Sequence, residues 1–133
     1  MKMVINGERL IKDLQDDFNF AYAFLTIEFF RNGSVRRDRY PAQQKISPQH
    51  KLETAWIWKK DKGCLDLHDY MTVLELENVL MDEFGLSTQV FRKSGNIWLE
   101  TTKTDNWTLK QQNDHGKEIS YGWKITEEDE SRS

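Results

Sequence analysis

The sequence predicts an α+β domain with a mainly antiparallel sheet built from two helix-hairpin pseudo-repeats. Two main helices are expected on one face of the sheet, and a short third helix near the C terminus. The first observation is a repeated stretch: residues 25–33 (LTIEFFRNG) return as residues 86–95 (LSTQVFRKSG), one residue longer. The second is that each copy follows apolar residues spaced four apart, as in an amphipathic helix. These residues are Leu10, Leu14 and Phe18 in the first copy and Leu76, Leu80 and Phe84 in the second.

Length and composition indicate one domain at residues 1–126, followed by a disordered acidic tail at 127–133. The 133 residues include seven Phe, five Trp and four Tyr, so aromatic side chains are expected to dominate the core. The pseudo-repeats cover about residues 4–40 and 64–102. A loop at 41–52 joins them, because that segment holds both prolines and three glutamines and has little apolar content.

The first half begins with a short strand and turn at residues 4–7, where Asn6 or Gly7 opens a helix at 8–18. Residues 24–31 are rich in β-branched and aromatic side chains and predict a strand. Asn32-Gly33 is a strong two-residue hairpin turn. The returning strand is expected at residues 34–40, as an exposed edge that ends at a proline.

The second half begins with a further hairpin, in which residues 53–58 and 64–67 are strands around a charged turn. Thr72 and Glu75 then form a capping-box pattern that starts a helix at residues 73–84. Gly85 is a left-handed cap at its end.

Residues 89–102 predict another hairpin, with its turn at 93–96. Thr108 to Gln111 resembles a second capping box and predicts a short helix that ends within residues 113–116, although Trp107 and Leu109 would suit a strand equally. Alternating apolar residues then predict a last strand at its C-terminal side. These residues are Ile119, Tyr121, Trp123 and Ile125.

A long apolar segment is missing, because the longest uninterrupted apolar run, residues 20–25, has six residues. A membrane span needs about twenty apolar residues, and a signal peptide roughly seven to fifteen. With Cys64 as the single cysteine, no internal disulfide forms. We therefore expect a soluble cytoplasmic protein that uses no membrane.

The sequence predicts no catalytic, cofactor-binding or metal-binding residues, and so a non-enzymatic protein. No serine lies in a strand-turn-helix elbow, and the seven glycines are scattered rather than grouped in a phosphate loop. A thiol, an imidazole and two carboxylates do fall close together, as Cys64, Asp66, His68 and Asp69. Metal sites usually draw ligands from separate elements, so this cluster is better explained as a polar strand end that leads to a helix cap.

The most probable function from the sequence is protein binding, because aromatic residues and arginine are enriched where proteins meet. The candidate interface is the hairpin at residues 89–102. Its residues are Phe91, Arg92, Ile97 and Trp98. Another protein is the expected partner, and a second copy in a homodimer is an open alternative.

Nucleic-acid binding is the alternative function, because residues 34–62 carry eight Lys or Arg against three acids and are interleaved with aromatic rings. Cations neutralise phosphates, and rings stack on bases. The candidate contacts are Arg36, Arg37, Arg39, Trp58, Lys59 and Lys60. Residues 63–90, by contrast, carry six acids and no Lys or Arg, and the whole chain is slightly acidic at −3.

Residues 90–113 follow the pattern VFRKSGNxWLxTTxTDxWTLxxQN. This stretch resembles the signature of a family of small uncharacterised bacterial cytoplasmic proteins. The resemblance extends over about residues 76–113, with a weaker match at 24–30. It implies a shared fold and a cytoplasmic bacterial setting, but no activity and no functional residues to carry over.

Overall fold

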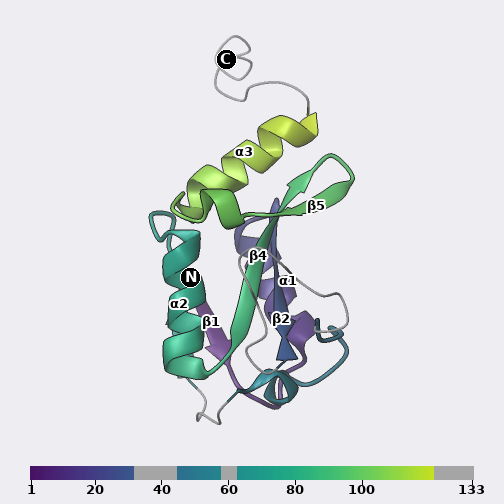
Figure 1. Ribbon diagram of the computed structural model, residues 1–133, viewed down its shortest axis with the longest axis vertical. Helices are drawn as coiled ribbons and strands as arrows, with labels where there is room; N and C mark the ends of the chain where they lie inside the picture. The colour runs from purple at the N-terminus through teal and green to yellow at the C-terminus, as the bar shows by residue number, and fades with distance from the viewer. Residues whose placement is uncertain (32–44, 58–62, 122–133) are drawn as a thin grey trace.

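The computed structural model describes residues 1–31, 45–57 and 63–121, which form an α+β fold (Figure 1). Within these ranges there are three α-helices, a two-stranded sheet of order β1-β3 and a three-stranded sheet of order β2-β4-β5, both antiparallel. In chain order the elements are β1 (Lys2–Ile5), α1 (Ile11–Ala21), β2 (Leu25–Phe30), the 3-10 helix η3 (Leu52–Ala55), β3 (Gly63–Asp66), α2 (Val73–Phe84), β4 (Ser87–Ser94), β5 (Ile97–Glu100), the 3-10 helix η4 (Thr102–Thr104) and α3 (Leu109–Tyr121). The predicted α+β class and the antiparallel pairing are confirmed. The expected single sheet is wrong for the described residues, whose strands form two sheets, and the expected short third helix is wrong, because α3 has 13 residues.

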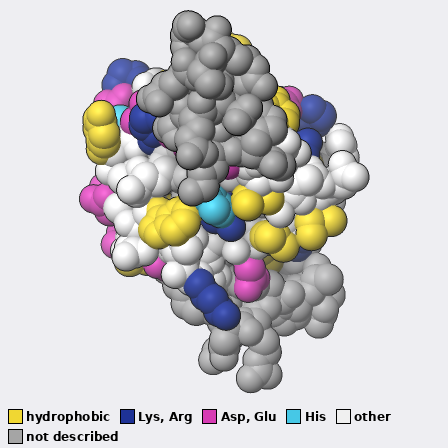
Figure 2. Space-filling view, turned by 90° about the horizontal axis from the view of Figure 1, so that it is seen from above, with side chains coloured by type: hydrophobic (Ala, Val, Ile, Leu, Met, Phe, Trp, Pro, Cys, Tyr) yellow, Lys and Arg dark blue, Asp and Glu magenta, His cyan; other side chains and the backbone are white. Residues whose placement is uncertain are grey.

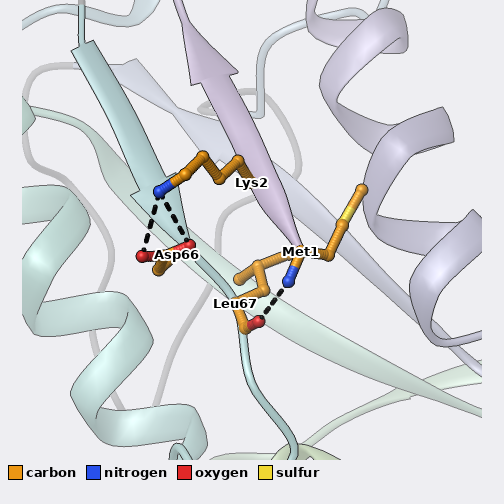
Figure 3. A network of polar contacts seen from close by, with 4 residues as sticks. All are labelled: Met1, Lys2, Asp66 and Leu67. Carbon is orange, nitrogen blue, oxygen red and sulfur yellow. Dashed lines mark hydrogen bonds and ion pairs between the residues drawn. The ribbon is translucent and has the colours of Figure 1, made fainter.

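The small sheet pairs β1, at the start of the chain, with β3, at the start of its second half. Met3 lies opposite Leu65, and both side chains are buried. Just outside the ladder, the Met1 ammonium donates to the Leu67 carbonyl at 2.9 Å (Figure 3). Within the ladder, the ammonium of Lys2 contacts the carboxylate of Asp66, its partner residue, at 3.2 Å. The predicted hairpin between residues 53–58 and 64–67 is therefore wrong, because β3 pairs with β1 while η3 is helical.

Helix α1 begins three residues later than predicted, at Ile11. The preceding residues close a turn instead, in which the Arg9 amide donates to the Asn6 carbonyl at 3.0 Å. The Asp13 carboxylate caps the helix by accepting from the Leu10 amide at 3.2 Å. The buried side of α1 is formed by Ile11, Leu14 and Phe18, none of which is exposed.

Helix α2 confirms its predicted bounds and both of its caps. The Thr72 hydroxyl accepts from the Glu75 amide at 3.1 Å, and the Glu75 carboxylate accepts from the Thr72 amide at 2.8 Å. Gly85 has the left-handed backbone (φ 64°) that ends the helix. The core residues of α2 repeat the spacing of those in α1, each 62 positions later: Val73, Leu76 and Leu80.

The larger sheet places β2 beside β4, so the two similar sequence stretches pair with each other. Ile27 lies opposite Val90 in the core, and Glu28 lies opposite Gln89. Strand β4 continues through the turn at Gly95 and Asn96 into β5, which confirms the predicted hairpin. The Asn32-Gly33 turn, the strand at 34–40 and the tail at 127–133 lie outside the described residues.

Helix α3 lies across the end of β4 near the hairpin turn (Figure 1). Its predicted capping box is confirmed, because the Thr108 hydroxyl accepts from the Gln111 amide at 3.1 Å. The predicted helix end within residues 113–116 is wrong, because α3 continues to Tyr121. The predicted last strand is also wrong where it is described, since Ile119 and Tyr121 belong to the helix; Trp123 and Ile125 lie outside the described residues. The helix continues because its packing against β4, rather than the alternating pattern, decides the local structure.

The predicted loop at 41–52 is described from residue 45 onward. Residues 45–51 contain no helix or strand, as expected, but Ile46 is fully buried and its amide donates to the Phe29 carbonyl at 2.9 Å. Leu52 is also fully buried. This part of the connection is therefore fixed to the core. Among the described helices, none has both the length and the apolar character of a membrane span.

Candidate functional site

Among the strands that the structure describes, β5 is the most exposed. Ile97, Trp98 and Leu99 are 59%, 42% and 40% exposed, and no described strand pairs with the outer edge of β5. The two-residue turn makes Ser94 and Ile97 a hydrogen-bonded pair, so the main-chain groups of Trp98 and Glu100 point away from β4. The strand thus offers both apolar side chains and main-chain groups that no described strand pairs.

Two of the four predicted interface residues lie elsewhere on the hairpin. Phe91 is half-buried, and the Lys45 ammonium lies 5.9 Å from the centre of its ring. On the same face of the sheet, Lys93 lies 6.0 Å from the Trp98 ring. Arg92 is half-buried beneath α3, on the opposite face from Phe91. Ile97 and Trp98 are therefore the members of the predicted set that a partner reaches most easily.

The Arg92 guanidinium is held by two neighbours from the α3 end of the chain. Its Nη1 donates to Gln112 Oε1 at 2.7 Å, and it lies 5.9 Å from the centre of the Trp107 ring. Gln112 is itself fully buried, and its Nε2 donates to the Thr104 carbonyl at 2.7 Å. Burial lowers the pKa of Arg92 from its usual value, but an arginine remains cationic at neutral pH.

A cavity of about 340 Å³ opens where β5 leads into η4. It is lined by Arg92, Leu99, Glu100, Thr102, Lys103 and Thr104. Two of these side chains are cationic and two carry hydroxyl groups. All six lie within residues 90–113, the stretch that resembles the bacterial family signature.

A second, more open groove of about 490 Å³ lies near the N terminus. It is lined by Met1, Phe20, Ala21, Tyr22, Leu67, His68, Asp69 and Tyr70. The Tyr22 hydroxyl donates to Asp69 at 3.0 Å; burial first, and then this hydrogen bond and the charge of Asp69, raise the pKa of Tyr22 to about 12. Tyr22 is therefore a neutral hydrogen-bond donor at neutral pH.

The Cys64, Asp66, His68 and Asp69 cluster does not assemble as a site. Cys64 is exposed, Asp66 pairs with Lys2, and Asp69 accepts from Tyr22. In the described ranges no three His, Cys, Asp or Glu side chains gather in a metal-binding arrangement.

The basic segment contributes little to the described surface. Arg36, Arg37, Arg39, Trp58, Lys59 and Lys60 all lie outside the described residues. Two lysines of that segment are described, and both face acids: Lys45 is 3.8 Å from Glu28, and Lys51 is 2.9 Å from Glu8. Nucleic-acid binding therefore stays a prediction from the sequence.

Hydrophobic side chains gather in several separate clusters on the face seen from above, with charged side chains between them (Figure 2). Comparisons with protein-family models, curated proteins and solved structures found no match. The resemblance of residues 90–113 to a family signature accordingly stays a prediction, and the candidate site rests on its own geometry.

Sequence reasoning missed Leu99, Lys103 and Gln112 as parts of this region. A signal for Leu99 was present, because three consecutive apolar residues at 97–99 interrupt the alternation expected of a strand with one solvated face. Nothing local marks Lys103 or Gln112. Their proximity to Arg92 depends on the path of η4 and α3 back over β4.

Proposed function

We propose that this chain is a non-enzymatic protein-interaction module that binds an extended segment of another protein along the outer edge of β5. The observation that carries the proposal is the combination on one strand of three exposed apolar side chains, Ile97, Trp98 and Leu99, with outward main-chain groups that no described strand pairs. An extended peptide that adds to a sheet edge uses such main-chain groups for affinity and the alternating side chains for specificity.

Exposed strand edges are usually protected by proline, inward charges or a covering element, because they pair readily with other chains. Strand β5 contains no proline, and its single charged residue, Glu100, stands at its end. Trp98 combines a large apolar area with a hydrogen-bond donor, which suits a binding surface. The outer edge of β5 thus lacks these protective features and suits contact with another protein.

The short length of β5 favours a segment of another protein over a second copy of the chain. Its four residues extend only about 13 Å. Stable interfaces bury roughly 800 Å² per partner, and a symmetric β5-to-β5 contact offers a small fraction of that area. An extended peptide, by contrast, contacts the edge and continues over neighbouring surfaces.

The test compares Glu100→Pro with Glu100→Ala. Both variants remove the same carboxylate, but only proline removes the amide that points outward, and edge positions accept proline. Proteins that the wild-type chain captures from its host are purified and recombined with each variant. We expect binding to be retained by Glu100→Ala and lost by Glu100→Pro, with slower amide hydrogen exchange at Trp98 and Glu100 in the wild-type complex.

Two results contradict the proposal. One is that every captured protein binds Glu100→Pro as well as it binds the wild type. The other is a concentration-dependent dimer in sedimentation that Glu100→Pro dissociates, because the occupant of the edge is then a second copy. A captured protein supports the proposal only if its binding depends on the outer edge of β5.

We also infer that the two halves of the chain are related by duplication, with both main helices on one face of the sheet. Three observations support this inference. Glu28 lies opposite Gln89 in one sheet, and Met3 lies opposite Leu65 in the other. The core residues of α1 and α2 are separated by a constant spacing of 62. Equivalent residues meet in this way when two antiparallel units are related by a two-fold axis perpendicular to the sheet. The helix correspondence differs by one turn from the four-apart stripes in the sequence.

A bacterial cytoplasmic setting is part of the same proposal. Cys64 supports it, because an exposed, unpaired cysteine is compatible with a reducing compartment. In this proposal the two repeated units carry the binding hairpin of β4 and β5, and η4 and α3 are added after the second unit.

A further inference from the structure

The half-buried Arg92 is unusual because it forms no ion pair with any described residue. No carboxylate of the described residues lies within 4 Å of its guanidinium; the side chain that it meets is the neutral amide of Gln112. Taking a guanidinium partly out of water is costly unless hydrogen bonds or an anion replace the lost solvation. The fold therefore holds a cation whose natural partner is not provided by its described neighbours.

Gln112 uses one of the five N–H donors of Arg92, and two of the other donors, on Nε and Nη2, form one edge of the guanidinium. Nη1 is occupied by Gln112, while Nε is buried without any hydrogen-bond partner. The Nε and Nη2 groups together present the parallel pair of donors that binds a carboxylate or phosphate through two hydrogen bonds. Gln112 and Trp107 restrict the rotation of the side chain, so this edge is already oriented.

The cavity beside Arg92 supplies further groups that suit an anion. Lys103 adds a second positive charge from η4, and Thr102 and Thr104 belong to the same lining. The Thr104 hydroxyl already accepts from Gln112 Nε2 at 2.8 Å. Glu100 also contributes to the lining, but it is directed to the opposite face of the sheet from Leu99 and Arg92, because side chains alternate along a strand. The lining thus carries two positive charges, from Arg92 and Lys103, against the one negative charge of Glu100.

We propose that this cavity is a binding site for a small anion that carries a carboxylate or phosphate group. Arg92 binds the anion with two hydrogen bonds, and Lys103 provides the second charge. This inference goes beyond the proposed function, because the site needs no partner strand along β5. The volume of about 340 Å³ accommodates a small organic acid or a phosphate ester.

The test follows the Nε–Hε signals of the arginines in ¹⁵N-labelled full-length protein by NMR. Sodium acetate and, in a separate series, sodium phosphate replace sodium chloride at constant ionic strength. We expect a saturable shift of the Arg92 signal with at least one of the two anions. A response to acetate alone indicates a carboxylate ligand, and tighter binding of phosphate indicates a phosphate ligand.

Lys103→Gln and Lys110→Gln form a matched pair of variants. Lys103 lines the cavity, whereas Lys110 is exposed on α3 and pairs with Asp114 at 2.9 Å. We expect Lys103→Gln to weaken anion binding roughly two- to fivefold, as the loss of one partly exposed charge does, and Lys110→Gln to leave it unchanged. Neither residue is in the core, so both variants are expected to fold.

The proposal is overturned if neither anion shifts the Arg92 signal in a saturable way. It is also overturned if Arg9, which is paired with Asp17 at 3.0 Å, responds as strongly as Arg92, because the effect is then general screening. Equal anion affinities of Lys103→Gln and Lys110→Gln would also overturn it, because Lys103 would then contribute no charge to the site.

Discussion

The carboxylate of Glu77 in α2 accepts a hydrogen bond from the Val90 amide in β4 at 3.0 Å. Both groups are buried, and β5 ends at Glu100, before it would pair with this part of β4. On the same edge, the Thr101 hydroxyl donates to the Val90 carbonyl at 2.9 Å. Glu77 and Thr101 thus complete the edge of the sheet where the hairpin stops.

Replacing Glu77 with alanine is therefore expected to lower the free energy of unfolding by about 1–3 kcal/mol, because the Val90 amide is left buried without an acceptor. Urea unfolding followed by circular dichroism measures the change. Glu83→Ala is the matched control, since Glu83 is exposed on the same helix, and a change within about 0.5 kcal/mol is expected there. Equal effects at the two positions would show that the Val90 contact contributes nothing.

The Thr72 cap is expected to contribute about 0.5–2 kcal/mol, the usual cost of replacing a capping threonine with alanine. Its hydroxyl accepts from the Glu75 amide at the start of α2. Thr108→Ala at the start of α3 is the corresponding change in the second capping box. Thermal unfolding of both variants tests whether the two caps act alike, and an unchanged midpoint for Thr72→Ala would contradict the prediction.

The other half of the α2 cap predicts a pH dependence. Hydrogen bonds from the Thr72 backbone, and then its side chain, hold the pKa of Glu75 below its usual value. Because the pKa is lower in the folded chain, the stability that Glu75 contributes is present above its unfolded pKa and is lost as pH falls through the folded pKa. The stability difference between wild type and Glu75→Gln should therefore shrink on acidification. A difference that stays constant from neutral to acid pH would contradict this.

Gly116→Ala is expected to destabilise the protein by about 1–3 kcal/mol, as overpacking does, although alanine is the better helix former. A Cβ at this position would lie 2.9 Å from Phe24 Cβ and 3.0 Å from Arg92 Cγ. Helix α3 would have to move away from β4. Lys117→Ala, one residue later on the same helix, is the control, and its thermal midpoint should remain close to that of the wild type. A stabilised Gly116→Ala would show that the close approach is absent in solution.

The nucleic-acid hypothesis makes a separate prediction for the basic segment at residues 36–62. A labelled single-stranded oligonucleotide should bind with an affinity that falls steeply between about 50 and 200 mM salt, because phosphate contacts release counterions. Fluorescence anisotropy measures the binding at each salt concentration. Binding that is absent, or that does not change with salt, would remove this function from consideration.

Local signals were sufficient for several elements. Thr72, Glu75 and Gly85 defined α2 at both ends, because capping bonds and a left-handed glycine act within a few residues. The turn at Gly95 similarly defined the hairpin of β4 and β5. The predicted interface residues Ile97 and Trp98 were found because they belong to such a local unit.

Other features were not predictable from local signals. Glu77, between Leu76 and Asn78, looks like a solvated residue, yet it faces the edge of β4. Its place four residues after Val73, on the apolar side of the helix, was the available signal. The period-two pattern that includes Ile119 and Tyr121 predicted a strand, but the packing of α3 against β4 decided for a helix.

The sequence by itself determined the fold class, the limits of α2 and the β4–β5 hairpin, because each depends on hydrophobic periodicity, caps or turns within one segment. Only the tertiary structure decided that β3 pairs with β1, that β2 pairs with β4, and that Arg92 meets Gln112 beside a cavity. These are contacts between segments far apart in the chain or on separate elements. They are selected by the burial of the whole core, and no short window of sequence records that choice.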